Sequence, residues 1–391
     1  MSTYLPHLSR AHAYVLALWS YGMVLARSCG TASIAAVLAP LLLCKESALR
    51  QRLREWCYDA TDKRGTNRQA LDVTTCFAPL LRWIVAWWPP SEQRLVLAMD
   101  ATTLGQRFTV LTISVVYRGS AIPVAWAVVT ATRKGAWRPH WIALFDHLRG
   151  AVPSEWTVLV LADRGLYARW LFQHIVALRW HPFLRINLGG QFRPAGAATF
   201  RPLMTVVPRI GDQWCGTVTC FVTREAQLGC TLVARWDADY TDPWLIVTDV
   251  PPTTAEAAWY GMRTWIERGF KAIKRGGWQW HQTKMTDPER ARRVWLAIAV
   301  ATLWVVSVGG EADALLPVSS VDGLPEVHGT RRRATQRSRP RLLSCFRRGV
   351  LTILAALLTG MALPLGRCVP EPWPIALPAR RDRLWYMQSY P

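Results

Sequence analysis

The sequence lacks the cysteine and histidine spacings that build zinc modules. Its nine cysteines are scattered, with no Cys-x-x-Cys pair and no His-x-x-x-His motif near them. Cys215, Cys220 and Cys230 lie closest together, but their spacing fits no standard module and leaves no evident fourth ligand, so we expect small residues on strands. An odd, dispersed set is typical of reduced thiols in the cytosol. The cysteines therefore argue against a structural zinc site and against a disulfide-stapled secreted module.

Two apolar runs are short for membrane segments. The apolar runs at residues 13–26 and 350–365 are both shorter than the roughly 20 residues that a membrane-spanning helix needs. We expect buried helices at both places, with no secretion signal and no membrane partner. A basic membrane-associated protein is the alternative that these two runs leave open.

Acidic residues are scarce relative to basic ones. The chain has 26 Asp and Glu against 47 Lys and Arg, which gives a formal net charge of +21. Such an excess favours a polyanionic partner or an anionic surface, and nucleic acid is the leading candidate. The sequence shows no internal repeat, and its 391 residues can bury a sizeable core in one domain with large insertions or in several domains.

The sequence predicts helices over residues 1–90. Residues 31–43 are apolar, and the stretch that follows the break after them places Leu49, Leu53 and Trp56 on one side and Arg50 and Arg54 toward another. Two short helices with a basic second one resemble a helix-turn-helix, whose second helix enters the major groove of DNA. An ordinary basic surface helix is the alternative.

A mixed α/β sheet is expected after residue 90, because β-rich runs there alternate with helical patterns. We expect strands at residues 94–100, 107–117, 121–130, 156–163 and 182–188, and helices at 141–148 and 164–176. Residues 189–250 contain only short β-rich pieces separated by Gly, Pro and Asp. A helix at 260–274, a buried helix from 287 and a basic linker at 328–341 complete the prediction.

Two acids are expected to lie together at one edge of this sheet. Asp100 and Asp163 each end a hydrophobic strand, where α/β sheets usually place ligand-binding groups. Neighbouring strands would make the two carboxylates converge, and paired carboxylates repel unless a cation such as magnesium lies between them. A third acid from a helix would complete a site for two metal ions, which suits in-line phosphoryl displacement.

The segment at 260–274 is the predicted source of the third acid. Wound at about 100° per residue, it places Tyr260, Arg263, Glu267 and Lys274 in a sector roughly 60° wide, with apolar residues on another side. Glu267 would face the metal ions, while Arg263 and Lys274 would bind phosphates of a DNA strand. The alternative is a surface helix with an ordinary Arg–Glu pair at i, i+4.

These motifs resemble one enzyme family. Asp100 in LAMDATTL, Asp163 in LADRGLY and the spacing Tyr260-x2-Arg263-x3-Glu267-x6-Lys274 are similar to the DDE transposases of bacterial insertion sequences, in the type-four group with the Tyr-Arg-Glu-Lys signature. The resemblance covers residues 94–304. It implies an RNase H-like fold in which a β-strand insertion separates the second Asp from the Glu.

The resemblance also implies roles for single residues. Asp100, Asp163 and Glu267 would be catalytic and would bind two Mg²⁺ ions, with Mn²⁺ as a possible substitute. The residues that would contact phosphates near the transposon end are Tyr260, Arg263 and Lys274. Trp244 in PWLIVTDVP would stack on a flipped base, and its alternative is an ordinary core tryptophan.

The expected domains follow from these assignments. Residues 1–90 would form a helical DNA-binding region that includes Arg50 and Arg54, and 91–310 an RNase H-like catalytic domain with 189–250 as an inserted β subdomain. Residues 311–391 would form a basic C-terminal region, partly disordered or helical.

The expected function is that of a transposase. It would bind double-stranded DNA at the terminal inverted repeats of its element, cleave there and join the 3′ hydroxyl ends to target DNA. We expect a homo-oligomer on DNA, in the cytoplasm at the nucleoid. The alternatives are an RNase H-like nuclease that cuts without joining and a DNA-end-binding regulator without catalysis.

Overall fold

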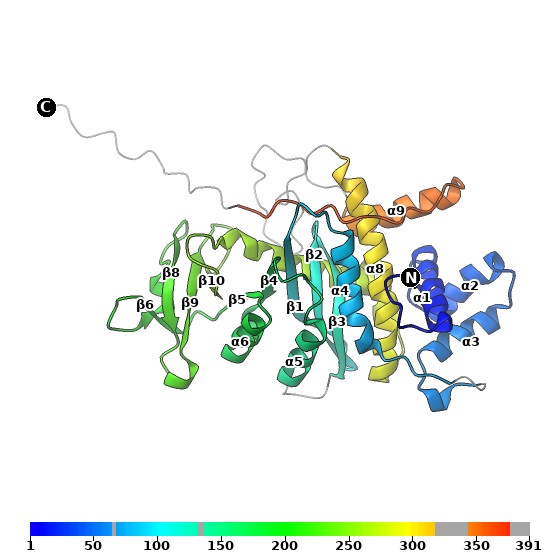
Figure 1. The fold of residues 1–391 in the computed structure, drawn as a ribbon, viewed down its shortest axis with the longest axis horizontal. Helices are drawn as coiled ribbons and strands as arrows, with labels where there is room; N and C mark the ends of the chain where they lie inside the picture. The colour runs from blue at the N-terminus through cyan, green and yellow to red at the C-terminus, as the bar shows by residue number, and fades with distance from the viewer. Residues whose placement is uncertain (65–67, 132–136, 317–342, 376–391) are drawn as a thin grey trace. The chain divides into compact units, whose positions relative to one another are not determined.

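The computed structural model describes residues 1–64, 68–131, 137–316 and 343–375 (Figure 1). The chain divides into two compact units. Unit 1 consists of Met1–Leu184 and Met262–Pro372, and unit 2 of Arg185–Gly261 and Trp373–Pro391. The basic linker predicted at residues 328–341 lies outside the described residues.

The predicted N-terminal helices are present. They are α1 (Arg10–Ala26), α2 (Thr31–Leu41), α3 (Glu46–Trp56) and α4 (Phe77–Trp87). The amphipathic pattern of α3 is confirmed, because Leu49, Leu53 and Trp56 are buried while Arg50 and Arg54 are exposed. Apolar spacing at i, i+3 and i+4 thus fixes which side of α3 packs on the rest of unit 1.

The sheet of unit 1 has the strand order β3-β2-β1-β4-β5. Its strands are β1 (Arg94–Leu104), β2 (Phe108–Tyr117), β3 (Ser120–Thr130), β4 (Thr157–Ala162) and β5 (His181–Arg185). β2 pairs antiparallel with β1 and β3, whereas β4 pairs parallel with β1 and β5. The mixed α/β sheet expected from the sequence is therefore confirmed.

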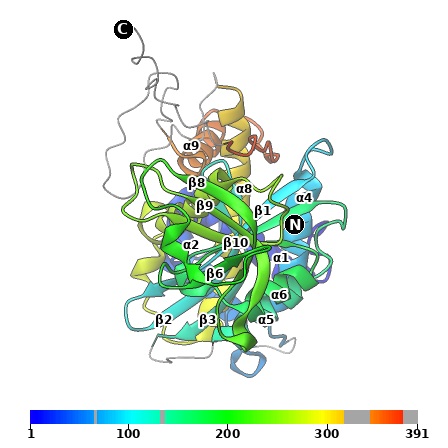
Figure 2. The ribbon, with the colours of Figure 1, turned by 90° about the vertical axis from the view of Figure 1, so that its left-hand side faces the viewer.

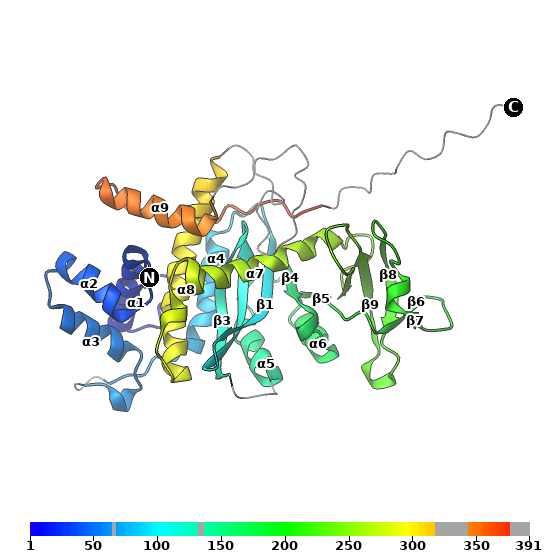
Figure 3. The ribbon, with the colours of Figure 1, turned by 180° about the vertical axis from the view of Figure 1, so that it is seen from behind.

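Helices cover both faces of this sheet. α5 (Trp137–Leu148) and α6 (Arg169–Ala177) lie on the face toward the viewer in Figure 1. On the opposite face, which Figure 3 turns to the front, α7 (Trp265–Lys271) packs against β1, β2 and β3. Layers of helix, sheet and helix bury the strands from both sides, which is why their sequences are almost continuously hydrophobic.

The longest helix, α8 (Pro288–Ala314), belongs to the core of unit 1. Asp287 caps it by accepting hydrogen bonds from the backbone N–H groups of Glu289 and Arg290. Within the described chain, α8 is the single helix long and apolar enough to cross a membrane. Of its most apolar stretch of 18 residues, 89% is buried inside the protein. A further apolar pair, α1 with α2, is bent by 97°.

The C-terminal apolar run is only partly the buried helix that its sequence predicts. α9 (Cys345–Leu358) packs on α8, and the two helices approach so closely that a Cβ on Gly309 would lie 1.8 Å from the carbonyl oxygen of Cys345. The helix ends at Leu358, and Gly360 follows with a φ of +68°. A residue in the left-handed region stops an α-helix, so the rest of the run leaves the helix and Leu358 is exposed.

Unit 2 is built from antiparallel strands in the order β10-β9-β8-β6-β7 (Figure 2). They are β6 (Gln191–Pro194), β7 (Arg201–Pro202), β8 (Gln213–Cys220), β9 (Leu228–Arg235) and β10 (Trp244–Thr248). Short strands are thus present where the sequence predicts β-rich pieces. Cys215, Cys220 and Cys230 lie on β8 and β9 as free thiols, as expected of small strand residues.

Candidate active site

The first acid, Asp100, lies within β1 rather than at its end. The predicted strand at residues 94–100 was too short. β1 continues to Leu104, and Asp100 itself pairs with Thr112 of β2. The carboxylate of Asp100 accepts a hydrogen bond of 2.7 Å from the backbone N–H of Ala101. Its side chain is 19% exposed, so it lies at the rim of the core where a polar group can still reach a ligand.

The second acid, Asp163, directly follows β4. Its carboxylate accepts a 2.7 Å hydrogen bond from the N–H of Arg164 and caps a short 3₁₀ turn. β1 and β4 are parallel neighbours with Ala98 opposite Leu161, and each acid comes two residues after that pair. The two carboxylates converge as predicted, since both lie within 3.3 Å of Nη2 of Arg263, although Asp100 lies inside its strand and not at the edge of the sheet.

The segment at 260–274 is not the continuous α-helix that its periodicity predicts. It consists of a 3₁₀ helix (Ala257–Thr264), α7 and a π turn (Ala272–Gly276). These forms have different numbers of residues per turn, so the calculated 60° sector does not describe the segment. The apolar side is confirmed, because Met262, Ile266 and Phe270 are buried.

A glycine lets α7 approach the sheet. A Cβ on Gly269 would lie 2.8 Å from the Cβ of Ala121 on β3 and 3.3 Å from its carbonyl oxygen. Only a residue without a side chain fits that contact without displacing one element. The close packing fixes α7 over β1, β2 and β3, and so fixes where Glu267 in its first turn can reach.

Arg263 joins the three acids. Its Nη2 lies 2.8 Å from Oδ2 of Asp100 and 3.3 Å from Oδ2 of Asp163, and its Nη1 donates to Oε1 of Glu267. The side chain is only 10% exposed. The structure thus brings all three predicted acids to one point, and it places there an arginine that the sequence prediction assigned to DNA phosphates.

The charges in this cluster oppose one another. Burial raises the pKa of Asp100, and the carboxylates of Glu267 and Asp163 act in the same direction. The guanidinium of Arg263 and the N–H of Ala101 lower that pKa. A cation is therefore what allows three acids to share this site.

The three carboxylates are chemically suited to a divalent metal ion, since carboxylate oxygens are ligands that magnesium prefers. In this structure, however, the guanidinium of Arg263 fills the point of convergence. Among the described residues, no group of three or more His, Cys, Asp and Glu is arranged so that it could hold an ion. Asp100, Asp163 and Glu267 are the residues that would hold the metal once Arg263 turned away.

The remaining predicted contact residues have different surroundings. Lys274 lies on the π turn and is half-buried, and burial, followed by the charge of Arg275, lowers its pKa. Trp244 and Tyr260 belong to unit 2, where both are buried with their ring centroids 5.2 Å apart. In this conformation Trp244 is an ordinary core tryptophan, which is the alternative to the base-stacking role.

Arg50 and Arg54 line a cavity beside α2 and α3 instead of projecting from a flat surface. Lys284 lines the same cavity and was missed by the sequence prediction. No sequence motif surrounds Lys284, so its position in the cavity wall is seen only in the three-dimensional structure.

Comparison with known proteins agrees with this geometry. No curated protein matches the chain. The family model described as Transposase DDE domain matches residues 91–304, a range that contains all three converging acids and Arg263. The match covers more than half of the sequence, and the chain therefore belongs to the family of transposases with a DDE domain.

Proposed function

We propose that this chain binds the terminal inverted repeats of its own element, cleaves DNA at those ends and joins the 3′ hydroxyl ends to target DNA. The observation that carries the proposal is the convergence of Asp100, Asp163 and Glu267 from β1, the end of β4 and α7. Each cleavage and each joining is an in-line displacement at phosphorus, with water as the first nucleophile and the 3′ hydroxyl as the second.

The acids would hold divalent ions, Mg²⁺ or in its place Mn²⁺. Such ions, when bound, stabilise the attacking and leaving oxygens of a phosphoryl displacement. Asp100 is held by the N–H of Ala101 and Asp163 by the N–H of Arg164, so the backbone orients both carboxylates. Glu267 is carried by a helix that Gly269 fixes against the sheet. This support is what a site needs to position a phosphate precisely enough for reaction.

Arg263 has two successive tasks in this proposal. In the protein alone it compensates the three carboxylates. When DNA and metal ions are present, its guanidinium is released and can bind a phosphate of the strand, for which its forked donors are suited. Lys274, Tyr260 and Trp244 are proposed as further DNA contacts, and Arg50 and Arg54 as contacts of the helical region.

The test compares the wild type with two variants that lose the same charge. The gene with its native flanking DNA is placed on a plasmid, and excision and new insertions are counted for the wild type, Glu267→Gln and Glu155→Gln. Glu155 is an exposed acid between α5 and β4, outside the cluster. We expect movement in the wild type and in Glu155→Gln, and a loss of about 10³-fold in Glu267→Gln, because a lost metal contact removes several kcal/mol of transition-state stabilisation.

The alternatives give different results in the same experiment. A nuclease without strand transfer would break the donor plasmid and leave no covalent junction between donor and target. A regulator without catalysis would act equally well as wild type and as Glu267→Gln. Junction sequencing and a DNA-binding assay on both proteins separate these outcomes.

A further inference from the structure

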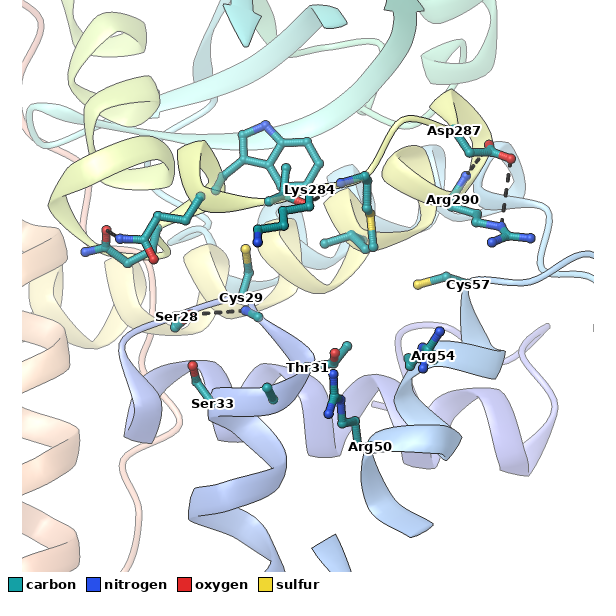
Figure 4. Close-up of a pocket in the computed structure, with 18 of the residues that line it drawn as sticks. Ser28, Cys29, Thr31, Ser33, Arg50, Arg54, Cys57, Lys284, Asp287 and Arg290 are labelled. Carbon is teal, nitrogen blue, oxygen red and sulfur yellow. Dashed lines mark hydrogen bonds and ion pairs between the residues drawn. The ribbon is translucent and has the colours of Figure 1, made fainter. Parts of the chain in front are cut away.

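A cavity of about 720 Å³ opens in unit 1, and none of the three acids lines it. One wall comes from the start of α2 and one side of α3, and the other from residues 279–290 at the start of α8 (Figure 4). This volume lies within the range of roughly 300–1,000 Å³ that is typical of ligand sites. The cavity is therefore large enough for a group of nucleotide size.

The charged residues of the cavity are mostly basic. Arg50, Arg54, Lys284 and Arg290 line it, and Asp287 is the one carboxylate among the described lining residues. Arg290 is held at the rim by Asp287 and by Asp62, whose carboxylate lies 3.0 Å from its Nη2. One basic residue is thus compensated.

The other three cations face the same space without compensation. Across residues 1–64, 68–131, 137–316 and 343–375, the side chains of Arg50, Arg54 and Lys284 have no hydrogen-bond or ion-pair partner. In Figure 4, Lys284 extends from the upper wall toward the side on which Arg50 and Thr31 lie. Like charges gathered around one cavity repel, so an anion bound there would be stabilised by all three.

Backbone donors add to this positive charge. The described chain supplies no side-chain cap for α2, which begins after Gly30, and no acceptor for the N–H groups of Thr31, Ala32 and Ser33. These residues also line the cavity, and the hydroxyls of Thr31 and Ser33 are further donors. The unpaired N–H groups of a helix start attract anions, and here the residues that carry them line a cavity with three uncompensated cations.

The two walls are held in place by hydrogen bonds. The N–H of Cys29 donates to the carbonyl of Trp278 at 2.7 Å, which ties the start of α2 to the segment at the opposite wall. The guanidinium of Arg293 on α8 donates to the carbonyl of Cys57 at 2.7 Å, just after α3. A cavity with fixed walls loses little entropy when a ligand binds.

We propose that this cavity binds phosphate groups of a DNA strand, and that the N-terminal helical region grips the DNA backbone here rather than reading bases. The proposal rests on the proposed function for its partner, DNA. Arg50 and Arg54 are one turn apart on α3 and both line the cavity, which suits phosphates more than base edges in a groove. Charge and backbone donors recognise phosphate without regard to sequence.

The test measures binding of the full chain to duplexes over a salt series. One duplex carries the element's terminal repeat and the other a scrambled sequence of equal length. The variants are Arg50→Gln, Arg54→Gln and Lys284→Gln, and Arg52→Gln is the matched control. Arg52 is exposed on α3 between the two cavity arginines but does not belong to the described lining, so its variant loses the same charge from the same helix.

Each cavity variant should bind both duplexes several-fold more weakly, with the salt slope reduced by about 0.9 for each lost phosphate contact. Arg52→Gln should keep the wild-type affinity and slope, and thermal melting should show all four variants folded. Equal losses in Arg52→Gln and the cavity variants would overturn the proposal, because net charge alone would then explain binding. Losses confined to the repeat sequence would overturn it in favour of base reading.

Two further outcomes are equally decisive. If calorimetry showed tight binding of inorganic phosphate or a mononucleotide and the duplex affinities did not change, the cavity would be a small-ligand site and the proposal wrong. The assay needs no cleavage, so its result is separate from that of the plasmid experiment. Cavity-dependent DNA binding without transposition would leave the inference standing and remove strand transfer from the function.

Discussion

The guanidinium of Arg263 donates a 2.8 Å hydrogen bond to the carboxylate of Asp100 across 163 positions of the chain. The same side chain also pairs with Asp163 and Glu267. Arg263 therefore compensates in one place the repulsion that would otherwise separate three acids. Any cation that takes the place of this guanidinium must compensate all three carboxylates together.

Removing this guanidinium should destabilise the metal-free protein. Arg263→Gln leaves three carboxylates without their cation, and we expect it to lower the free energy of unfolding by about 2 kcal/mol. This is less than the roughly 3–5 kcal/mol of a fully buried pair, because the side chains of Asp163 and Glu267 are over a third exposed to water. Mg²⁺ should raise the melting temperature of the variant more than that of the wild type. Calorimetry in EDTA and in Mg²⁺ measures both effects.

Arg263→Lys serves as the control for charge alone. Lysine keeps the positive charge but cannot present two forked donors, so we expect an intermediate loss of stability. Equal melting temperatures for wild type and Arg263→Gln in EDTA would contradict the compensating role of Arg263.

The contact between α7 and β3 should not tolerate a methyl group. Gly269→Ala would place a Cβ 2.8 Å from the Cβ of Ala121, and we expect a loss of about 1–3 kcal/mol as the helix shifts. Urea unfolding measures it. Gly229→Ala is the matched control, because a Cβ there meets no atom of the described chain within 4 Å. Little or no loss in Gly269→Ala would show that α7 can adjust to the sheet, and an equal loss in both variants would show that this contact is not its cause.

Continuous hydrophobic runs carried most of the fold prediction. The runs around Asp100 and Asp163 are hydrophobic because helices cover both faces of the sheet, and that same burial makes them recognisable in sequence. Two antiparallel turns give β3 the direction of β1, and α5 then connects β3 to β4, so β4 pairs parallel with β1 and the two acids come together.

The site was predicted less well where residues far apart in the sequence come into contact. The spacing of Arg263 and Glu267 suggests an i, i+4 pair, but no local pattern reveals that Asp100 and Asp163 complete the shell around the same guanidinium. A periodicity of 3.6 cannot foresee that the segment changes from 3₁₀ to α to π, since tertiary packing decides those changes. Lys284 was missed for the same reason.

Trp244 offers a direct choice between packing and base stacking. The centroid of its ring lies 4.7 Å from that of Tyr240 and 5.2 Å from that of Tyr260, and the residue is 7% exposed. Trp244→Ala should therefore lower the free energy of unfolding by about 3–5 kcal/mol. Trp244→Phe keeps an aromatic face and should lose less. Strand processing that slows in Trp244→Ala while stability and end binding stay unchanged would instead support stacking on a flipped base.

Lys274 can be tested against a neighbour with the same charge. Burial, followed by the charge of Arg275, lowers the pKa of Lys274, whereas Lys271 at the end of α7 is exposed. An anionic phosphate beside Lys274 would favour its protonated form, so DNA binding at alkaline pH should take up a proton in the wild type and not in Lys274→Gln. The salt slope of binding should fall by about 0.9 in Lys274→Gln. Lys271→Gln should keep both the slope and the proton uptake, and calorimetry in buffers of different ionisation enthalpy measures the latter. If the two variants behave alike, Lys274 makes no phosphate contact of its own and its charge acts only through the general field of the protein.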